Sequence, residues 1–225
     1  MKIAIDGLSA TGKTACSKLL AKKLNYKVFN TGNLYRMVGL QLISNNVVPE
    51  DIKSIERVLK TTKLSIKNNR YYVNNLDVTE ALEQDLVALT VTKYSAIEVV
   101  KEFIRKYQKA FIEENENIIM EGRDIAERIM PDADFKFYFY ADINTRAKIL
   151  SKKRPNITLE EVKKELLSRD EYDINTSNFV KPKDAIIINI HNKDENEIVQ
   201  IMLNHLKNVK QTYQSSKWIC LYATK

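Results

Sequence analysis

The stretch Gly7-Leu8-Ser9-Ala10-Thr11-Gly12-Lys13-Thr14 decides the fold class of this chain. It matches G-x-x-x-x-G-K-[ST], with an apolar run before it and helical spacing of apolar residues after it. Glycines let the backbone approach phosphate oxygens, the lysine reaches the outer phosphates, and the threonine hydroxyl suits Mg²⁺. We therefore predict that all eight residues bind ATP, with Mg²⁺ as a second cofactor and Thr14 as its ligand.

Length and composition limit the class of protein. The chain has 225 residues, of which 44% are apolar, which fits one domain over 1–225 with a sizeable core. We see no secretory signal and no apolar run of about 18 residues, so we expect no membrane span. Cys16 and Cys220 are far apart and show no metal-ligand spacing, which is typical of reduced thiols in a cytoplasmic protein. The net charge of +7 is scattered and attracts anions in general, and no recognised motif indicates nucleic-acid binding.

Short apolar runs alternate with segments of helical spacing. Five runs are predicted to be buried strands, namely Ile3–Ile5, Tyr26–Phe29, Ile118–Met120, Phe135–Tyr140 and Ala185–Ile188. Three apolar stripes predict helices: Cys16, Leu19, Leu20 and Leu24; Leu34, Val38 and Leu42; Leu159, Val162 and Leu166. This alternation indicates an α/β fold with a parallel sheet that helices cover on both faces.

Two stretches depart from the alternation. Period-two patterning with Asn-Asn turns predicts a small antiparallel β insert at about 61–79. An irregular segment, about 151–158, separates two predicted helices and is interpreted as a short lid. The second of those helices begins with a capping box, Thr158 with Glu161. The core is then expected to comprise 1–60, 80–150 and 160–210.

Three polar clusters follow strands or end a helix. Thr31 is predicted to cap a helix in which Arg36 lies opposite the apolar stripe, so that Arg36 is either a phosphate ligand or a solvated surface residue. Glu121-Gly122-Arg123-Asp124 follows the third strand, where open α/β sheets bind ligands, although a structural ion pair would also fit there. Arg169 and Asp173 are four residues apart, which also fits a salt bridge along one helix.

These clusters, together with the P-loop and Pro131–Asp134, resemble the bacterial-type cytidylate kinase family. The resemblance runs from Met1 to about His191. It implies a P-loop core with a five-stranded parallel sheet, a monophosphate-binding insert and a short lid. It also implies transfer of the γ-phosphoryl group of ATP to CMP or dCMP.

The resemblance implies a role for each matching residue. Arg36 and Arg123 would hold the acceptor phosphate, and Asp124 would face the cytosine amino group. Asp173 would bind the sugar hydroxyls, and Arg169 would lie near the transferring phosphates. Catalysis is thus assigned to Lys13, Arg123 and Arg169. The set of acceptor-binding residues is Thr31, Tyr35, Arg36, Thr92, Lys101, Arg123, Asp124 and Asp173.

This sequence departs from the family pattern in three places. Lys101 and Thr176 stand where the family usually has arginine, and Ile149-Leu150 stand where the lid usually has an arginine pair. A lysine does not reproduce the two-pronged contact of a guanidinium group, and a threonine carries no charge. These changes bear on acceptor choice and on the rate of transfer.

A monophosphate acceptor is already largely dianionic at neutral pH, because its second pKa is about 6. It needs no general base, so we expect direct in-line transfer by a monomer that uses small-molecule nucleotides. Another acceptor, either UMP or a hydroxyl compound, stays open, because Asp6, Glu121 or Asp124 could serve a hydroxyl acceptor as the base. A degenerate nucleotide sensor that binds without turnover is the remaining alternative.

Overall fold

A five-stranded parallel sheet forms the centre of the computed structural model, which describes residues 1–67, 70–84, 87, 93–176 and 179–207. The strand order is β2-β6-β1-β7-β8. The strands are β1 (Lys2–Gly7), β2 (Lys27–Asn30), β6 (Ile118–Gly122), β7 (Phe135–Tyr140) and β8 (Ile186–Asn189). All five predicted strands are therefore confirmed, and every pairing between them is parallel.

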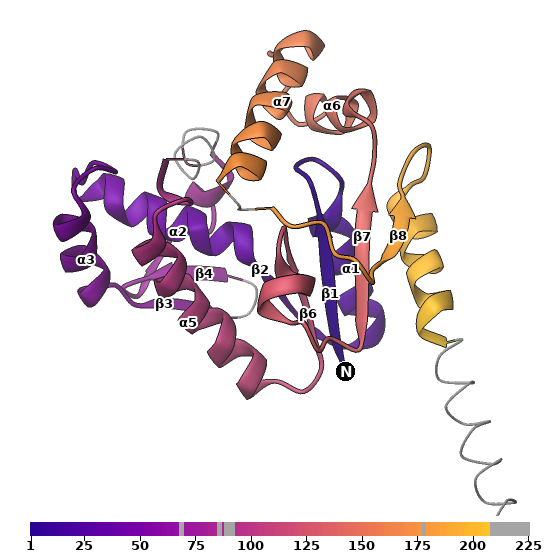
Figure 1. Cartoon of the computed structure of the whole chain (residues 1–225), viewed down its shortest axis with the longest axis horizontal. Coiled ribbons are helices and arrows are strands. Elements are labelled where there is room, and N and C mark those ends of the chain that lie inside the picture. Colours follow the sequence, from indigo (N-terminus) through magenta and orange to yellow (C-terminus); the bar gives the residue numbers. More distant parts are fainter. Residues whose placement is uncertain (68–69, 85–86, 88–92, 177–178, 208–225) are drawn as a thin grey trace, which may run out of the picture.

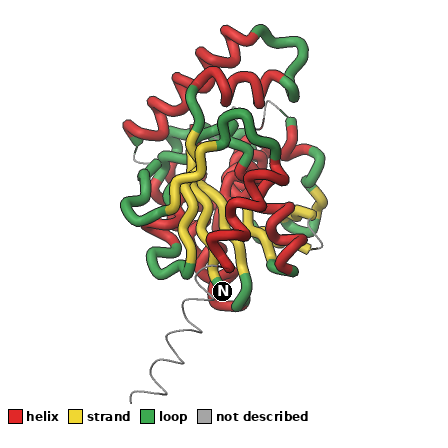
Figure 2. The backbone as a smooth tube through the Cα atoms, turned by 90° about the vertical axis from the view of Figure 1, so that its right-hand side faces the viewer, coloured by secondary structure: helices red, strands yellow, loops and turns green. Residues whose placement is uncertain are grey.

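Helices cover both faces of this sheet, as the alternation of strands and helices predicts (Figure 1, Figure 2). Their bounds are α1 (Lys13–Leu24), α2 (Thr31–Ser44), α3 (Ile52–Thr61), α5 (Glu98–Glu114), α6 (Ile143–Ser151), α7 (Leu159–Asn175) and 195–207, with short turns η1 (Ala81–Glu83) and η2 (Ile125–Ile129). Side chains alternate along β1, so Ile3 and Ile5 pack into one core while Ala4 packs into the other. The first core contains α1 and 195–207, and the second contains α2, α3 and α5.

The helix pair α6 and α7 stands beyond the carboxyl ends of the strands, at the top of Figure 1. The pair has a small core of its own, built on Ala147, Val162 and Leu166. The predicted capping box is present, because the Thr158 side chain accepts from Glu161 N and the Glu161 side chain accepts from Thr158 N. The irregular segment predicted at about 151–158 does connect these two helices.

The predicted insert is a separate antiparallel sheet of β3 (Leu64–Lys67), β4 (Arg70–Val73) and β5 (Leu76–Asp77). Asn74 and Asn75 have φ of 48° and 69°, which matches the two-residue hairpin turns that Asn tolerates. The other predicted turn, Asn68-Asn69, lies outside the described residues. The insert packs its inner residues, such as Leu64 and Val73, into the core of α2, α3 and α5.

Two predictions of burial are wrong in part. Ile187 of β8 is 58% exposed, because β8 is the edge strand of the sheet and one of its faces is open to solvent. Leu159, in the first turn of α7, is 37% exposed, and the buried face of that helix is instead Val162, Leu166, Asp170 and Asp173. Within the described part of the chain, no helix is both long enough and apolar enough to cross a membrane.

Candidate active site

The loop 7–14 connects β1 to α1 at the carboxyl edge of the sheet. Gly7 has φ of +154°, and a Cβ there would lie 2.6 Å from the Phe139 carbonyl oxygen, so only glycine fits. Gly12 has φ of +76° and occupies the N-cap of α1, whose first turn contains no acidic residue. The first amide groups of α1 therefore point out of an uncapped helix end, which favours an anion.

The Lys13 ammonium lies folded against this loop. Its Nζ donates to the carbonyl oxygens of Gly7 and Leu8, each at 2.7 Å, and to Thr11 Oγ1 at 3.2 Å. Burial lowers the pKa of Lys13 to about 8. A phosphate at the loop would offer this buried cation a stronger acceptor than neutral carbonyl groups.

Three polar side chains meet where β6, β2 and α1 come together. Thr14 Oγ1 donates to Glu121 Oε2 at 3.2 Å, and Asn30 Nδ2 donates to Glu121 Oε1 at 2.7 Å. Glu121 is buried, and burial raises its pKa while the Lys13 ammonium opposes that shift. A hydroxyl and a carboxylate side by side form an oxygen donor set of the type that Mg²⁺ prefers.

The cap of α2 is Asn30 rather than Thr31, which corrects the sequence-based prediction. Asn30 Oδ1 accepts from Asn33 N at 2.9 Å, whereas Thr31 is the first residue of the helix. The Thr31 hydroxyl is buried and accepts from Gln108 Nε2 at 3.1 Å. Asparagine and threonine are both good N-caps, so the sequence offered two adjacent candidates, and the structure uses the first.

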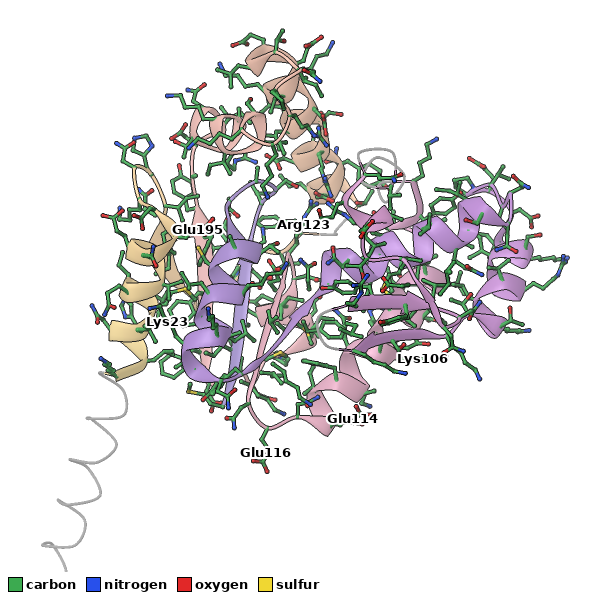
Figure 3. All side chains as sticks on the ribbon, turned by 180° about the vertical axis from the view of Figure 1, so that it is seen from behind. Lys23, Lys106, Glu114, Glu116, Arg123 and Glu195 are labelled. Atoms are coloured by element: carbon green, nitrogen blue, oxygen red, sulfur yellow. The ribbon has the colours of Figure 1, made fainter. Side chains whose placement is uncertain are left out.

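Arg123 lies where the loop after β1 meets the end of α7, and Figure 3 labels it there. One of its guanidinium nitrogens donates to Ser9 Oγ at 2.6 Å, and another forms an ion pair with the Asp173 carboxylate. Burial, followed by the charge of Arg169, lowers the pKa of Arg123 to about 9. The cluster Glu121–Asp124 is thus connected to both the P-loop and α7, as its place after a strand predicts.

The buried face of α7 changes from apolar to charged as the helix approaches the sheet. Val162 and Leu166 pack into the small core, and Asp170 and Asp173 continue the same face one and two turns later. Asp170 pairs with Arg146 of α6 at 2.7 Å, and both side chains are buried. Asp173 is paired with Arg123, so the alternative of a salt bridge between Asp173 and Arg169 along the helix is not what the structure shows.

Arg36 and Arg169 add further positive charge beside Arg123. Arg36 donates to the Leu82 carbonyl oxygen at 2.8 Å, which holds its guanidinium group in place and excludes a freely solvated side chain. Burial lowers the pKa of Arg169, and the charge of Arg36 is the next largest influence in the same direction. Within the described residues, Arg169 Nε has no hydrogen-bond partner. Such a group of partly buried cations favours anions that offset its charge.

The model of the cytidylate kinase family matches residues 3–208. Proteins named cytidylate kinase from Clostridium botulinum (strain Loch Maree / Type A3) and Thermosipho melanesiensis are each 35% identical to it, covering 92% of this chain and 98% and 96% of their own lengths. The chain belongs to the cytidylate kinase family. It is therefore an ATP-dependent nucleoside monophosphate kinase.

A solved structure shares the fold of this chain. The Thermus thermophilus protein TT1252 matches with a TM-score of 0.52 at 15% identity, covering 92% of this chain and 96% of its own. This likeness concerns the fold alone. The cytidylate kinase fold here comprises a five-stranded parallel sheet between helices, with the small antiparallel sheet at its side.

Most residues that the family resemblance singles out lie together at one edge of the sheet. Asp124 is mostly buried, and burial raises its pKa while Arg128, Arg105 and Lys101 oppose the shift. Tyr35 is close enough to Asp124 for that carboxylate to raise the pKa of its phenol further, after burial. Thr92, the remaining predicted base contact, lies outside the described residues.

Three residues of this cytidylate kinase site were not assigned a binding role from sequence. Asn30 and Glu121 stand beside Thr14, and Arg146 pairs with Asp170. Glu121 carried a signal, because it ends a predicted strand next to a glycine. Arg146 did not, because its partner Asp170 is far away in sequence and belongs to another helix.

Proposed function

We propose that this chain transfers the γ-phosphoryl group of ATP directly to CMP or dCMP, giving ADP and CDP or dCDP. The observation that carries the proposal is the group of cations beyond the P-loop lysine, in which the charge of Arg169 acts on Arg123 and that of Arg36 acts on Arg169. Lys13, Mg²⁺ and the P-loop amides would hold the polyphosphate of ATP, and Asp173 pairs with only one of these arginines. A second phosphate, that of the acceptor, would offset the remainder.

For this reaction the protein has to position the two phosphates and to stabilise their negative charge. An oxygen of the acceptor phosphate attacks the γ-phosphorus, and the bond from that phosphorus to the leaving oxygen of ADP breaks. The attacking oxygen is already deprotonated at neutral pH, because the second phosphate pKa is about 6. Lys13, Arg123 and Arg169 would stabilise the charge that moves between donor and acceptor.

A hydroxyl acceptor would require a free carboxylate as general base. Asp6 accepts two backbone hydrogen bonds, from Ile125 N and Ala126 N, and is completely buried. Glu121 accepts from Thr14 and Asn30. Asp6 and Glu121 are therefore engaged in other contacts, and of the three candidate bases Asp124 alone could serve a hydroxyl acceptor.

Mg²⁺ fits the pair formed by Thr14 and Glu121. The two oxygen donors are 3.2 Å apart, and Asn30 orients the carboxylate from its other side. When bound, the ion would neutralise charge on the β- and γ-phosphates. Thr14 would be a direct ligand, and Glu121 would hold the hydroxyl or a water of the ion's shell.

The acceptor would lie between the end of β6, α2 and α5. Arg36 and Arg123 would bind its phosphate, and Asp124 would accept from the cytosine amino group beside Lys101. Asp173 would bind the sugar hydroxyls. Its carboxylate would then accept hydrogen bonds from the sugar while it remains paired with Arg123. Tyr35 and Thr31 would line the same region, Thr31 through its place in the first turn of α2.

The segment 151–158 would act as the lid that excludes water during transfer. The segment contacts α7 through Arg154, which forms an ion pair with Glu165 of that helix at 2.7 Å. Because Arg169 lies on the same helix as Glu165, movement of α7 would carry Arg169 with it. The lid would thus bring a cation to the transferring phosphates as it closes.

The test is a panel of acceptors with ATP and Mg²⁺, in which CMP, dCMP, UMP, AMP and GMP are assayed separately by product chromatography. We expect CDP or dCDP with equimolar ADP. Turnover of UMP at the rate of CMP would show that the base is not selected. ATP binding without turnover of any acceptor would contradict the proposal and favour a nucleotide sensor.

A further inference from the structure

Asp6 is a fully buried carboxylate that the transfer step does not use. It is the last residue before the P-loop, and it pairs with Gly122 in the β1–β6 ladder. Its Oδ1 accepts from Ile125 N at 3.0 Å, and its Oδ2 accepts from Ala126 N at 2.7 Å. Both oxygens therefore hold the backbone immediately after Arg123 and Asp124.

These two amides are the first two of η2, whose N-cap residue is Asp124. An aspartate at an N-cap normally accepts from the amides of its own helix. Among the described residues, the Asp124 side chain makes no such bond, and its carboxylate forms an ion pair with Arg128 at 3.7 Å. Asp6, which belongs to β1, accepts these two bonds in place of Asp124. The Asp124 carboxylate is therefore available to a ligand.

We infer that Asp6 is a positioning residue for the acceptor: it caps η2 in place of Asp124, so that Asp124 faces the nucleobase and Arg123 stays aligned with the P-loop. This inference rests on the proposed function. It extends that function by assigning base selection partly to a residue that does not touch the acceptor.

A second contact ties the same segment to the P-loop. Arg123 donates to Ser9 Oγ at 2.6 Å, so the loop holds the side chain of Arg123 while Asp6 holds the backbone that follows it. Gly122 allows this close approach, since a Cβ there would lie 2.7 Å from the Ile125 side chain. Donor and acceptor sites are thereby fixed relative to each other through one short segment.

The Asp6→Asn variant tests the inference at pH 8, where the wild-type carboxyl group is ionised. There an amide oxygen replaces only one of the two acceptors, and its NH₂ group faces a backbone N–H. The unsatisfied amides of η2 would then attract the carboxylate of Asp124, the residue that directly precedes η2 in the sequence. We expect the KM for CMP to rise about tenfold and the preference for CMP over UMP to fall about tenfold, with the KM for ATP changed less than about twofold. An unchanged KM for CMP and an unchanged preference would overturn the inference.

Two comparisons separate positioning from a general loss of stability. Asp51→Asn removes the N-cap carboxylate of α3, which accepts from Ser54 N at 3.0 Å away from the site, and should leave both acceptor readouts at the wild-type values. In the Asp6→Asn background, Asp124→Ala should reduce the CMP preference by a smaller factor than it does in the wild-type protein, because the two changes act on the same contact. Fully multiplicative losses would contradict the proposed route through Asp124.

If Asp6→Asn does not fold, amide hydrogen exchange of the wild-type protein still tests whether Asp6 binds the first two amides of η2. The amides of Ile125 and Ala126 should exchange at least about 100-fold more slowly than an unprotected chain. Exchange close to the unprotected rate would overturn the inference. Failure of the proposed function is recognised separately, because wild-type protein would then form no CDP while the amide protection is unaffected.

Discussion

Lys101 of α5 donates from Nζ to the carbonyl oxygen of Thr176 at 3.4 Å, which joins the acceptor side of the site to the C-cap of α7. These are two of the positions at which the sequence departs from the family pattern. The Thr176 hydroxyl is occupied by a bond of 2.7 Å to the Tyr172 carbonyl oxygen, so Thr176 presents its backbone rather than a charge. Lys101 also favours the ionised form of Asp124 through its charge, although burial is the larger influence on the Asp124 pKa.

Lys101→Met should therefore weaken acceptor binding. Loss of the cation beside Asp124 and of the contact to α7 is expected to raise the KM for CMP about threefold to tenfold, with a smaller change in the KM for ATP. Initial-rate kinetics with each substrate varied in turn would measure both constants. Lys106→Met, an exposed position on the same helix that Figure 3 labels, is the control and should behave as wild type. Equal effects of the two variants would remove Lys101 from the site.

Asp170→Asn should destabilise the helix pair. It leaves the buried Arg146 guanidinium without its carboxylate partner at 2.7 Å, a change that costs about 3 kcal/mol in buried pairs. Urea unfolding would measure this loss. Glu160→Gln is the control, because Glu160 pairs with Lys163 at 2.7 Å but its side chain is 80% exposed, and the expected change is below about 0.5 kcal/mol. A loss no larger in Asp170→Asn than in Glu160→Gln would contradict the role of the buried pair.

The sequence predicted those parts of the fold that depend on local patterns. Ile3–Ile5 and Phe135–Tyr140 were recognisable as strands because buried parallel strands are continuous apolar runs. The P-loop was recognisable because glycine at two fixed positions is a steric requirement, which the Gly7 backbone confirms. The capping box at Thr158 was recognisable because both of its bonds lie within one turn.

The long-range partners were not predictable in this way. Asp173 was expected to pair with Arg169 on the same face of α7 or to bind a ligand, and it contacts Arg123, which directly follows β6, instead. Asp6 was considered only as a possible base, because nothing in its neighbours along the chain indicates that it caps η2. Such contacts depend on the order of strands in the sheet, which places β1 between β6 and β7. Periodicity along one segment carries no information about that order.

Asp124→Ala should reduce the discrimination between cytosine and uracil. Loss of one hydrogen bond from a buried carboxylate to the cytosine amino group corresponds to about a 10-fold to 100-fold decrease in the ratio of kcat/KM for CMP to that for UMP. Rates with the two nucleotides, measured under identical conditions, give this ratio. Asp132→Ala, an exposed carboxylate on the loop before β7, should leave the ratio unchanged. A wild-type ratio in Asp124→Ala would exclude Asp124 from base recognition.

Asp6 should also make stability depend on pH. Burial raises its pKa from 3.8 to about 7, outweighing the two N–H donors. Between pH 4 and 7 the folded state therefore keeps a proton that the unfolded state has released, so the free energy of unfolding falls as pH rises, by at most about 4 kcal/mol. Urea unfolding at pH 5 and pH 7.5 should show a steeper decrease in the wild type than in Asp6→Asn. The same decrease in both proteins would show that other groups cause it.

Lys13 of the P-loop should be required for the phosphorylation of CMP by ATP. CDP formation by Lys13→Ala is compared with that of the wild type and of Lys22→Ala, which changes an exposed lysine in the last turn of the same helix. We predict that Lys13→Ala keeps the wild-type circular dichroism spectrum and loses at least about 10²–10³-fold in kcat, whereas Lys22→Ala retains full activity. Wild-type rates of CDP formation in a folded Lys13→Ala protein would contradict the account.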